Sequence, residues 1–577
     1  MISRILISAA AALTLSACAT IPEIAPASSP EPVTVRIIGI NDFHGNLEPL
    51  RSASKLTMPD GSEEYVPVGG AAYLATAINQ RRAKSEHSLV ISAGDLISAS
   101  PLVSSLFLDE PTIGAMNRIG LTFNAVGNHE FDRGAQELLR MQDGGCEKYT
   151  LRDPCRVEQF TGAEFGFLAA NVTKEDGATL FPPFGIQRFG SGPGEVAIGV
   201  IGLTLEDTPG IVTPSGIAGL TFSDEADAIN ALIPQLKAQG VDAVVVAIHQ
   251  GLNNDGGYND QTCGALSGSL MEILDRLDPQ VDLVISGHTH QAYICDYSQV
   301  DPRHSMLVTS AGSAGAMLTD ITLTIDPALG KVIARGADNV PVQSPRFDDA
   351  GAQLPANAAF PLVSADAEIA AYVARYAAAA KSESSRPVGK ISASAERRGG
   401  DSPLGSLIAD AQLEGTRSAG AQIAMMNSGG IRASLVAVPD GSITYGDIYS
   451  VQPFGNTLVT KSFAGAQVLA LLEQQFAADG RISLLSVSNG FAVQYDPTRP
   501  LGEKIVAAML DGQPIDPAAT YRVTMNSFLA SGGDGFSIFD EGTDAIIGPV
   551  DLDAMEEYLR AVPARDLPEA GRIIEIK

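Results

Sequence analysis

The sequence is poor in positive charge and in long apolar runs. It contains 38 Lys and Arg against 67 Asp and Glu, which gives a formal net charge of -29 at pH 7. Such a surface does not neutralise the row of phosphates of a nucleic-acid polymer, so we exclude that class of partner. A small anionic substrate is compatible with this charge, because bound cations and a few arginines make a single site locally positive. Beyond the N-terminal segment, no run approaches the roughly 20 apolar residues of a membrane span.

The N-terminal segment is typical of a processing signal. Arg4 precedes an apolar stretch at 5–15, which is too short to span a bilayer as a mature helix. The stretch ends in Leu15-Ser16-Ala17-Cys18, which is similar to the bacterial lipobox, although an ordinary cleaved signal peptide is the alternative. We expect a signal peptide at 1–18, lipidation of Cys18 and a flexible Pro-, Ala- and Ser-rich tether at 19–32. The protein is then exported to the periplasm or cell envelope and attached to the membrane through this lipid only.

Cysteine is scarce and has no Cys-x-x-Cys spacing, which argues against a thiolate metal site. When Cys18 is set aside, four cysteines are left, and an even number in an exported chain predicts two disulfides with three connectivities. The most economical connectivity is local and pairs Cys146 with Cys155 and Cys263 with Cys295.

The chain of 577 residues is too long for one ordinary core, so we expect two domains. Strand-like and helix-like segments alternate from about 33 to 325, as βαβ units require. The composition turns to Pro, Gly, Ser and Asp near 338–354, and an alanine-rich helix is predicted at 365–385. These features predict an α/β domain at 33–345, a linker with a helix at 346–386 and a second mixed domain at 387–577.

Only seven histidines occur, and five of them lie in short polar segments that follow apolar runs. Runs rich in Val, Ile and Leu predict buried parallel strands at 33–40, 88–93, 123–126, 241–248 and 281–286. Because the carboxyl ends of such strands form the crevice of an open α/β sheet, we expect the following segments to meet at one sheet edge: Asp42-Phe43-His44, Gly94-Asp95, Gly127-Asn128-His129-Glu130, His249 and Gly287-His288-Thr289-His290. Imidazole, carboxylate and amide oxygen suit zinc or manganese. The pattern therefore predicts a metal-assisted hydrolase.

In type, order and spacing these motifs resemble the calcineurin-like metallophosphoesterases, and specifically the bacterial 5′-nucleotidase and UDP-sugar hydrolase family. The resemblance implies a four-layer metallophosphoesterase β-sandwich flanked by helices. It also implies a second α/β nucleotide-binding domain, joined to the first by a linker helix. His87 and His304 lie outside the motifs, and we expect them to be ordinary structural residues.

The resemblance also implies a centre of two divalent ions, either zinc, manganese or cobalt. One ion would be bound by Asp42, His44 and His290, the other by Asn128, His249 and His288, and Asp95 would bridge both. Some family members carry glutamine where His290 stands. Two ions about 3.5–4 Å apart lower the pKa of a bound water and hold the attacking and leaving oxygens, and a carboxylate is the natural bridge because it offers two oxygens.

His129 and Asp132 are implied to act on the substrate rather than on the ions. His129 would stabilise the transferring phosphoryl group or protonate the leaving oxygen, and Asp132 would orient it. The alternative is a loop hydrogen bond without a catalytic role.

The C-terminal region contains three Gly-rich motifs that follow the order of the family's nucleotide-binding domain. They are Asn427-Ser428-Gly429-Gly430-Ile431-Arg432, Gln452-Pro453-Phe454-Gly455-Asn456 and the segment 526–535. By resemblance Phe454 and Phe528 would stack on the base, Asp534 would bind the ribose, and Asn427 would contact the base edge. Arg398 and Arg432 would face the phosphates, although Arg397 is an alternative to Arg398. Domain closure about a hinge at 360–386 would bring nucleotide and metals together.

We therefore predict an exported, monomeric 5′-nucleotidase that cleaves nucleoside phosphate esters with metal-activated water. A 2′,3′-cyclic phosphodiesterase with 3′-nucleotidase activity, a nucleotide-sugar hydrolase and a sulfur-oxidising thiohydrolase share the fold. A surface lipoprotein that only binds a metal or ligand is the alternative of another class, and it would have no need of the His129–Asp132 pair.

Overall fold

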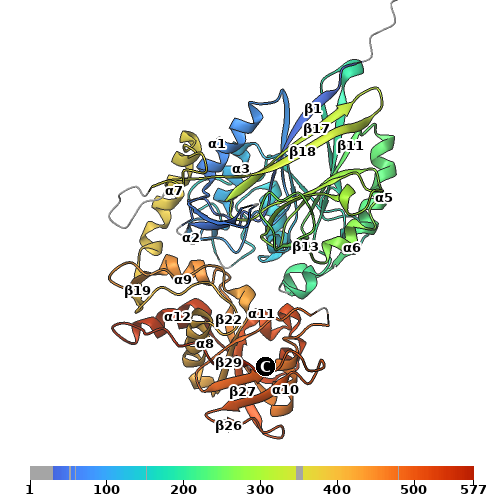
Figure 1. Cartoon of the computed structure of the whole chain (residues 1–577). Coiled ribbons are helices and arrows are strands. Elements are labelled where there is room, and N and C mark those ends of the chain that lie inside the picture. Colours follow the sequence, from blue (N-terminus) through green and yellow to red (C-terminus); the bar gives the residue numbers. More distant parts are fainter. Residues whose placement is uncertain are drawn as a thin grey trace, which may run out of the picture.

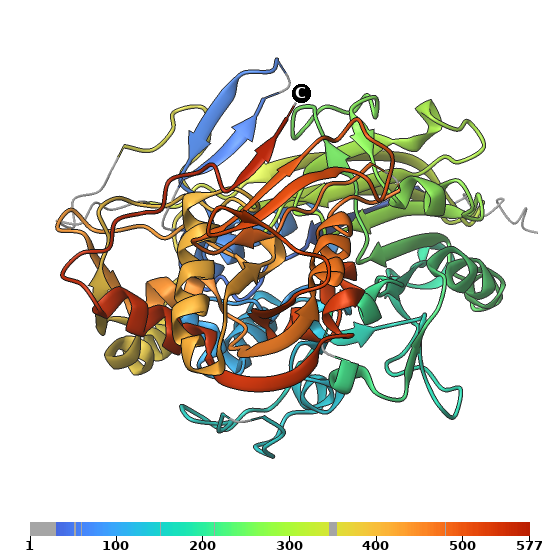
Figure 2. The same cartoon turned by 90° about the horizontal axis from the view of Figure 1, so that it is seen from below.

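The computed structural model describes residues 30–576, except 51–52, 59, 151, 213, 346–354 and 479. The expected signal peptide, Cys18 and most of the expected tether lie outside these residues. Figure 1 shows two layered units, one from the N-terminal and one from the C-terminal part of the chain, connected through helix α7 (Ala367–Ser384), and Figure 2 shows them from below, with the C-terminal unit in front. Within the described part of the chain, no helix is both long and apolar enough to cross a membrane.

The first unit contains two six-stranded sheets stacked face to face. Their strand orders are β18-β17-β1-β4-β5-β6 and β15-β16-β14-β11-β9-β8. Between them lies an apolar layer in which Ile37 and Ile91 from one sheet and Val200 and Val245 from the other are fully buried. The strands of the first sheet are β1 (Val33–Ile40), β4 (His87–Ser92), β5 (Phe123–Ala125), β6 (Gly166–Leu168), β17 (Met317–Asp326) and β18 (Lys331–Pro341). Those of the second are β8 (Phe184–Phe189), β9 (Val196–Leu203), β11 (Ala243–Ile248), β14 (Val281–Ser286), β15 (Ala292–Asp296) and β16 (Leu307–Ala311).

Helices cover the outer face of each sheet, because successive strand residues point to opposite faces. Ile38, next to the inward Ile37, packs with helices α1 (Ala71–Arg82) and α3 (Glu110–Ile119). Val244 and Val246 pack with α5 (Glu225–Ala238) and α6 (Leu270–Leu274) on the other side. The four-layer β-sandwich flanked by helices is thereby confirmed.

The predicted strands form, but they do not lie in one sheet. β1, β4 and β5 are parallel neighbours in the first sheet, whereas β11 and β14 are parallel neighbours in the second. The expectation of a single sheet edge was therefore wrong. Apolar runs of this length reveal a buried strand, but its partners are set by long-range packing between the two sheets.

The second unit is a mixed α/β structure, as the resemblance implied. Its larger sheet has the order β23-β20-β27-β22-β28 and its smaller one β26-β25-β24-β29. The strands are β20 (Ile423–Met426), β22 (Thr457–Ala464), β23 (Ser486–Val487), β24 (Phe491–Tyr495), β25 (Ile505–Leu510), β26 (Gln513–Pro514), β27 (Thr520–Asn526), β28 (Thr543–Val550) and β29 (Ile573–Glu575). The helices are α8 (Pro403–Gly415), α9 (Tyr445–Val451), α10 (Gly465–Glu473), α11 (Ser527–Ala530) and α12 (Asp551–Arg560).

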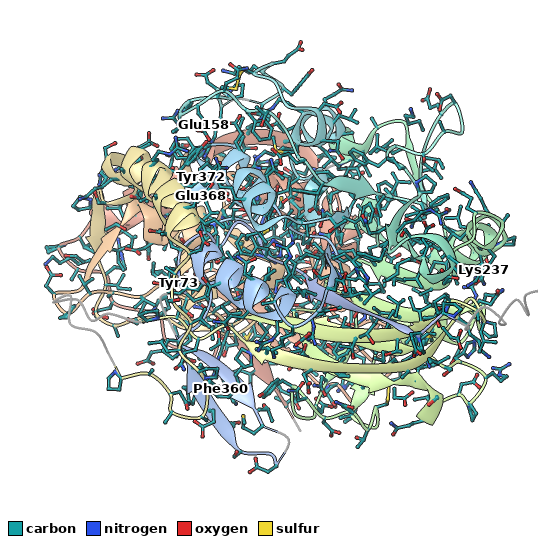
Figure 3. All side chains as sticks on the ribbon, turned by 90° about the horizontal axis from the view of Figure 1, so that it is seen from above. Tyr73, Glu158, Lys237, Phe360, Glu368 and Tyr372 are labelled. Atoms are coloured by element: carbon teal, nitrogen blue, oxygen red, sulfur yellow. A yellow bond between two sulfur atoms is a disulfide. The ribbon has the colours of Figure 1, made fainter. Side chains whose placement is uncertain are left out.

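Helix α7 is the helix predicted at 365–385. It begins at Ala367, directly after Asp366, whose side chain accepts two backbone N–H groups of the first turn. Its buried face packs on the first unit, where the Arg118 guanidinium lies 3.9 Å from the centre of the Tyr372 ring (Figure 3).

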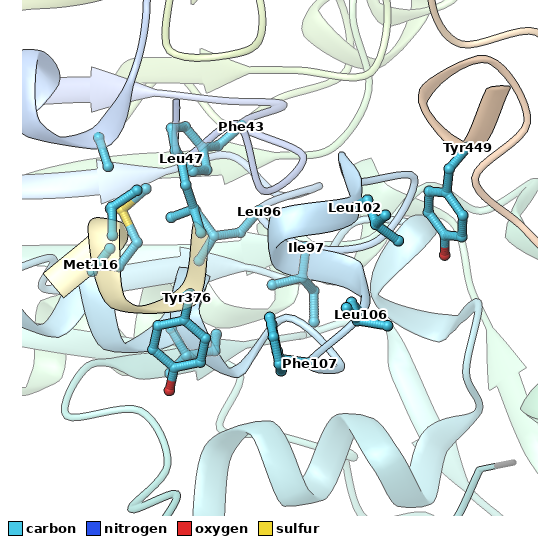
Figure 4. Packing of buried hydrophobic residues seen from close by; sticks show 14 of the residues in the cluster. Phe43, Leu47, Leu96, Ile97, Leu102, Leu106, Phe107, Met116, Tyr376 and Tyr449 are labelled. Atoms are coloured by element: carbon cyan, nitrogen blue, oxygen red, sulfur yellow. The ribbon is translucent and has the colours of Figure 1, made fainter. Parts of the chain in front are cut away.

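Helices α7 and α9 share one hydrophobic cluster with the first unit. The ring centres of Tyr376 and Phe107 are 5.1 Å apart, and Figure 4 shows Tyr449 of α9 on the side of Leu102, which opens the short helix α2 (Leu102–Ser105). Arg152 Nη2 donates to the Tyr449 hydroxyl at 3.2 Å. The two units are therefore in direct contact in this structure.

Both disulfides of the local connectivity are present. They link Cys146 to Cys155 and Cys263 to Cys295. The first closes the loop that carries Arg152, and the second joins the segment before α6 to β15. Short ribbons complete the fold: β2 (Ser54–Thr57) with β3 (Glu63–Val66), β7 (Val172–Lys174) with β10 (Leu220–Phe222), β12 (Asn253–Asn254) with β13 (Leu266–Ser267), and β19 (Pro387–Lys390) with β21 (Ser442–Thr444).

Candidate active site

The segments that follow β1, β4, β5, β11 and β14 converge at one end of the sandwich. The N–H of Asp42 donates to the carbonyl of Gly94, and that of His44 donates to the carbonyl of Asp95, both at 3.0 Å. From the other sheet, the N–H of His288 donates to both carboxylate oxygens of Asp42 at 3.1 and 3.0 Å. Loops from both sheets are thus bonded into one site.

Two neighbouring groups of side chains there have the donor atoms of metal sites. In each group the ligand atoms lie within 4.8 Å of one another, and the groups are Asp42, His44 and His290, and Asp95, His249 and His288. Asn128 Oδ1 lies 3.1 Å from both His249 Nε2 and His288 Nδ1. Asp95 Oδ2 lies 3.0 Å from His249 Nε2 and 3.7 Å from His44 Nε2, so Asp95 reaches both groups.

Backbone carbonyls orient one histidine ring in each group. His44 Nδ1 lies 3.0 Å from the carbonyl oxygen of Ser98, and His249 Nδ1 lies 2.9 Å from that of Ala93. A ring nitrogen that faces a carbonyl carries a hydrogen, so in the neutral ring Nε2 bears the lone pair. His44 Nε2 and His290 Nε2 are 3.2 Å apart, and two imidazole nitrogens with a carboxylate are a suitable ligand set for zinc, manganese or cobalt.

The backbone at this site is held in a conformation that L-residues seldom adopt. Five of the predicted ligands have positive φ: Asp42 (48°), His44 (45°), Asp95 (48°), His288 (70°) and His290 (57°). A left-handed non-glycine residue costs about 1–3 kcal/mol, and such strain persists where the surrounding structure fixes it. Gly94 leaves no room for a side chain, because a Cβ would lie 2.7 Å from His249 Nδ1.

The carboxylates dominate the electrostatic field of the site. Burial raises the pKa of Asp95, but the charges of His249 and His129 bring the net pKa well below its usual value. Burial lowers the pKa of His249, yet Asp95 outweighs it and raises that pKa to about 10. Burial and the charge on His249 lower the pKa of His288 to about 4. Positive charge is therefore stabilised beside Asp95, as a cation site requires.

Glu130 is a site residue whose role the sequence motifs do not indicate. Its buried carboxylate accepts the N–H groups of Asp95 (3.0 Å), Leu96 (2.8 Å) and Gly127 (2.7 Å). Burial and the charge on Asp95 raise its pKa to about 7. Glu130 fixes the β4 loop to the β5 loop, and hence the spacing of Asp95 and Asn128. The sequence feature that could have pointed to this role is the position of Glu130 directly after His129.

His129 and Asp132 form a direct hydrogen bond. His129 Nδ1 and Asp132 Oδ2 are 2.8 Å apart. Burial lowers the pKa of His129, but Asp132 and Asp95 outweigh burial and raise it overall. The His129 ring is stacked on that of Phe454 from the second unit, with centres 5.7 Å apart and planes at 20°.

Arg432 also reaches the site from the second unit. Its Nη2 lies 3.4 Å from His44 Nε2, and its guanidinium lies 6.0 Å from the centre of the Phe454 ring. Burial lowers the pKa of Arg432, and Asp95 and Asp132 act against this decrease. The structure therefore brings Arg432 and Phe454 to the residues of the first unit.

The residues predicted to bind the base and the ribose lie close together in the second unit; they are Asn427, Asp534 and Phe528. Asn427 Nδ2 donates to Asp534 Oδ2 at 2.7 Å, and Asn526 Nδ2 donates to Asn427 Oδ1 at 3.0 Å. The Phe528 ring covers Gly533, where a Cβ would lie 2.5 Å from it. Hydrogen bonds and packing thus fix the loops that carry the predicted base and ribose residues.

The two adjacent arginines differ in their surroundings. Arg398 is 74% exposed in its side chain and pairs with Glu396 at 3.4 Å, so the structure does not bring it to the site. Arg397 Nε donates to the carbonyl of Ile431 at 2.8 Å, and burial and the neighbouring Arg432 lower its pKa. The structure places Arg397 beside Arg432, in agreement with the alternative left open by the sequence.

Two family models match the chain. Residues 35–292 match the calcineurin-like phosphoesterase model, and residues 380–541 match the 5′-nucleotidase C-terminal domain model. The two matches together cover every residue of the site described above.

Similar proteins extend over most of the chain. Endonuclease YhcR of Bacillus subtilis is 30% identical over 541 residues, which are 92% of this chain, and the chain spans only 40% of that protein. Cell wall protein Lmo0130 of Listeria monocytogenes is 30% identical over 98% of this chain and 71% of its own length. The crystal structure of a 5′-nucleotidase precursor from Thermus thermophilus superimposes with a TM-score of 0.73 at 27% identity, covering 94% of this chain and 99% of that one.

Proposed function

The chain belongs to the calcineurin-like phosphoesterases that carry a 5′-nucleotidase C-terminal domain, a family of hydrolytic enzymes, and on this premise we propose that it is an exported dimetal 5′-nucleotidase. Its substrates are nucleoside phosphate esters. The single observation that carries the proposal is the meeting of Arg432 and Phe454 with His44 and His129. A nucleotide held by the second unit then has its phosphate beside the metal ligands.

We assign the ligand sets as the sequence analysis did. Asp42, His44 and His290 would hold one ion, Asn128, His249 and His288 would hold the other, and Asp95 would bridge both. When bound, the ions supply an activated water and neutralise the charge of the phosphoryl group. The donor set described above supports zinc, manganese or cobalt in these places.

The catalytic work of the chain itself falls on His129. Asp132 accepts the hydrogen from its Nδ1, so Nε2 points away from the aspartate and faces the substrate. From there the protonated ring donates to a phosphoryl oxygen or gives its proton to the leaving oxygen of the ribose. The net increase of the His129 pKa supports this acidic role.

The second unit supplies the remaining contacts of the substrate. Arg432 and Arg397 bind phosphoryl oxygens through their planar guanidinium groups, and Arg398 is kept as the alternative to Arg397. Phe454 and Phe528 stack on the base. Asp534 accepts from the ribose hydroxyls, and Asn427, which is fixed by Asn526 and Asp534, contacts the base edge.

The assignment of export and of the domain boundaries is also part of the proposal. Two disulfides support an oxidising compartment, and lipidation of Cys18 would keep a monomer in the cell envelope. The metal-binding domain spans 33–345 and the substrate domain 387–577, with a hinge within 360–386. A cross-link that fixes this hinge is expected to abolish turnover.

Substrate assays test the proposal. AMP, UDP-glucose, 2′,3′-cyclic AMP and bis(p-nitrophenyl) phosphate are each assayed with zinc, manganese and cobalt. Fastest turnover of AMP supports a 5′-nucleotidase, and fastest turnover of UDP-glucose or of the cyclic nucleotide favours those alternatives of the same fold. Lack of hydrolysis of all four refutes the catalytic proposal.

Two variants separate chemistry from substrate selection. His129→Ala is expected to lower kcat by about 10²–10⁴ with the metal content unchanged; near-normal turnover would refute the role of His129. Phe454→Ala is expected to raise KM for AMP about 10-fold or more and to leave KM for ribose 5-phosphate unchanged, because that ester has no base.

A further inference from the structure

The loop between β4 and α3 makes an unusual connection to the metal-binding groups. Five of its non-glycine residues have positive φ: Asp95 (48°), Ser98 (64°), Ala99 (48°), Leu108 (58°) and Asp109 (63°). Each left-handed residue is unfavourable by about 1–3 kcal/mol, so another interaction must hold the loop in this shape.

Asp109 provides that interaction. Its side chain is completely buried, and Oδ2 accepts the N–H of Ser98 at 3.0 Å while Oδ1 accepts the hydroxyl of Ser104 at 2.6 Å. Arg133 Nη1 also donates to Oδ2. Burial raises the pKa of Asp109, but Arg133 and the hydroxyl donors bring it below its usual value. The carboxylate is therefore charged and fully hydrogen-bonded.

The residue that Asp109 fixes is the one that orients His44. The carbonyl of Ser98 faces His44 Nδ1 at 3.0 Å, while the N–H of the same residue is bonded to Asp109. The loop also lies directly on the backbone beside His44, since a Cβ on Gly45 would be 2.4 Å from Ser100 Oγ and 2.8 Å from Ser104 Cβ. A shift of the loop would therefore move both the ring and its backbone.

We propose that Asp109 is a positioning residue for the metal group formed by Asp42, His44 and His290. It fixes the Ser98 carbonyl, which sets the tautomer and the plane of the His44 ring so that Nε2 points at the group. Outer partners of this kind change metal affinity by about 10- to 100-fold when removed. Arg133 donates to Asp109 and directly follows Asp132, the partner of His129. Its guanidinium therefore connects the loop that orients His44 to the segment that carries His129. This inference rests on the proposed role of His44 as a ligand.

The test measures zinc binding rather than turnover. Asp109→Gly removes the carboxylate and tolerates the positive φ, and Asp109→Asn keeps one acceptor oxygen. Zinc stoichiometry and both dissociation constants are measured by competition with a chromophoric chelator, and the Tm is measured in EDTA. We expect one zinc to bind about 10- to 100-fold more weakly in Asp109→Gly, partial recovery in Asp109→Asn, and little change for the other zinc.

Glu110→Gln is the matched control. Glu110 is the neighbouring residue, is 2% exposed and pairs with Arg140 at 2.8 Å, but it bonds to the N–H of Cys155 rather than to the Ser98 loop. We expect it to lower the Tm in EDTA and to leave both zinc affinities unchanged. Equal zinc affinities in the wild type and Asp109→Gly would overturn the inference, as would an equal loss in Glu110→Gln.

Two further outcomes are decisive. If the wild type binds fewer than two zinc ions, the proposed dimetal function fails, and the inference fails with it. If neither Asp109 variant folds, Arg133→Gln is measured instead, because the Arg133 side chain is partly exposed; unchanged zinc affinity in that variant refutes the positioning role.

Discussion

Asp551 gives the second unit a pH-dependent stability whose size follows from its burial. It is the first residue of α12 and is 3% exposed. Its carboxylate accepts the N–H of Leu552 at 2.8 Å and contacts Asn456, but burial outweighs these bonds and raises its pKa to about 7. Asn456 ends the Phe454 loop and accepts the hydroxyl of Ser527 at 3.0 Å, so Asp551 lies behind the substrate loops.

The direction in which stability changes with pH follows from the protonation of Asp551 in the folded and unfolded chains. Between about pH 4 and pH 7 the folded chain keeps a proton on Asp551 that the unfolded chain releases, so stability falls as the pH rises through this window. A shift from 3.8 to about 7 corresponds to about 4 kcal/mol at 1.36 kcal/mol per unit. The N-terminus of α12 stabilises the charged form by about 0.3–1 kcal/mol, which leaves about 3 kcal/mol.

Asp551→Asn removes this titration and keeps the shape of the side chain. We expect the variant and the wild type to have the same Tm near pH 4 and the variant to be more stable by about 3 kcal/mol at pH 8. For a unit of this size that difference is about 6–12 °C in Tm. Calorimetric scans of both proteins in EDTA between pH 4 and 8.5 measure it. A difference in Tm that does not change with pH would refute the argument.

The remaining predictions concern the site. In Glu130→Gln the amide oxygen can take the place of Oε2, which leaves the amide donor against the backbone N–H of Leu96. The variant is expected to lower stability by about 1–3 kcal/mol and to weaken zinc binding; an unchanged Tm and zinc affinity would contradict its role. Arg397→Ala is expected to lower kcat/KM for AMP about 10- to 100-fold, at about 1.5–3 kcal/mol for a charge-assisted bond, whereas Arg398→Ala stays within about 2-fold. The reverse ranking would favour Arg398. Gly533→Ala inserts a methyl into the Phe528 ring, so KM for AMP is expected to rise with kcat nearly constant; an unaltered KM would count against base stacking there.

The sequence allowed prediction of the residues that converge and of the linker helix. Apolar runs that end in Gly or a polar residue identify the carboxyl ends of buried strands without knowledge of their neighbours. The sequence could not assign the strands to two sheets, because β1 and β11 carry the same kind of apolar run. It also could not decide between Arg397 and Arg398, since adjacent side chains of a non-helical segment point to different sides and only the position of Ile431 selects one.

Residues that act through the backbone were beyond prediction for a different reason. Glu130 and Asp109 bond to N–H groups, which every residue type offers, so no sequence pattern marks their partners. Both stabilise loops with positive φ, and only the structure reveals those angles. Side-chain ligands have a chemical type that a sequence displays, whereas the groups that orient them are recognised only by geometry.

The contact between Arg432 and His44 implies that substrate charge and domain contact are coupled. A guanidinium 3.4 Å from the nitrogen of a proposed metal ligand would be repelled by the divalent cations that the site is proposed to hold, and burial already disfavours its charge. A phosphate between the cations and Arg432 reverses this balance, because its charge is attracted to both. A neutral nucleoside lacks that charge, although Phe454 would stack on its base equally well. Under the proposed function, phosphate esters would therefore favour the approach of the two units, whereas nucleosides, which have lost the phosphate, would not.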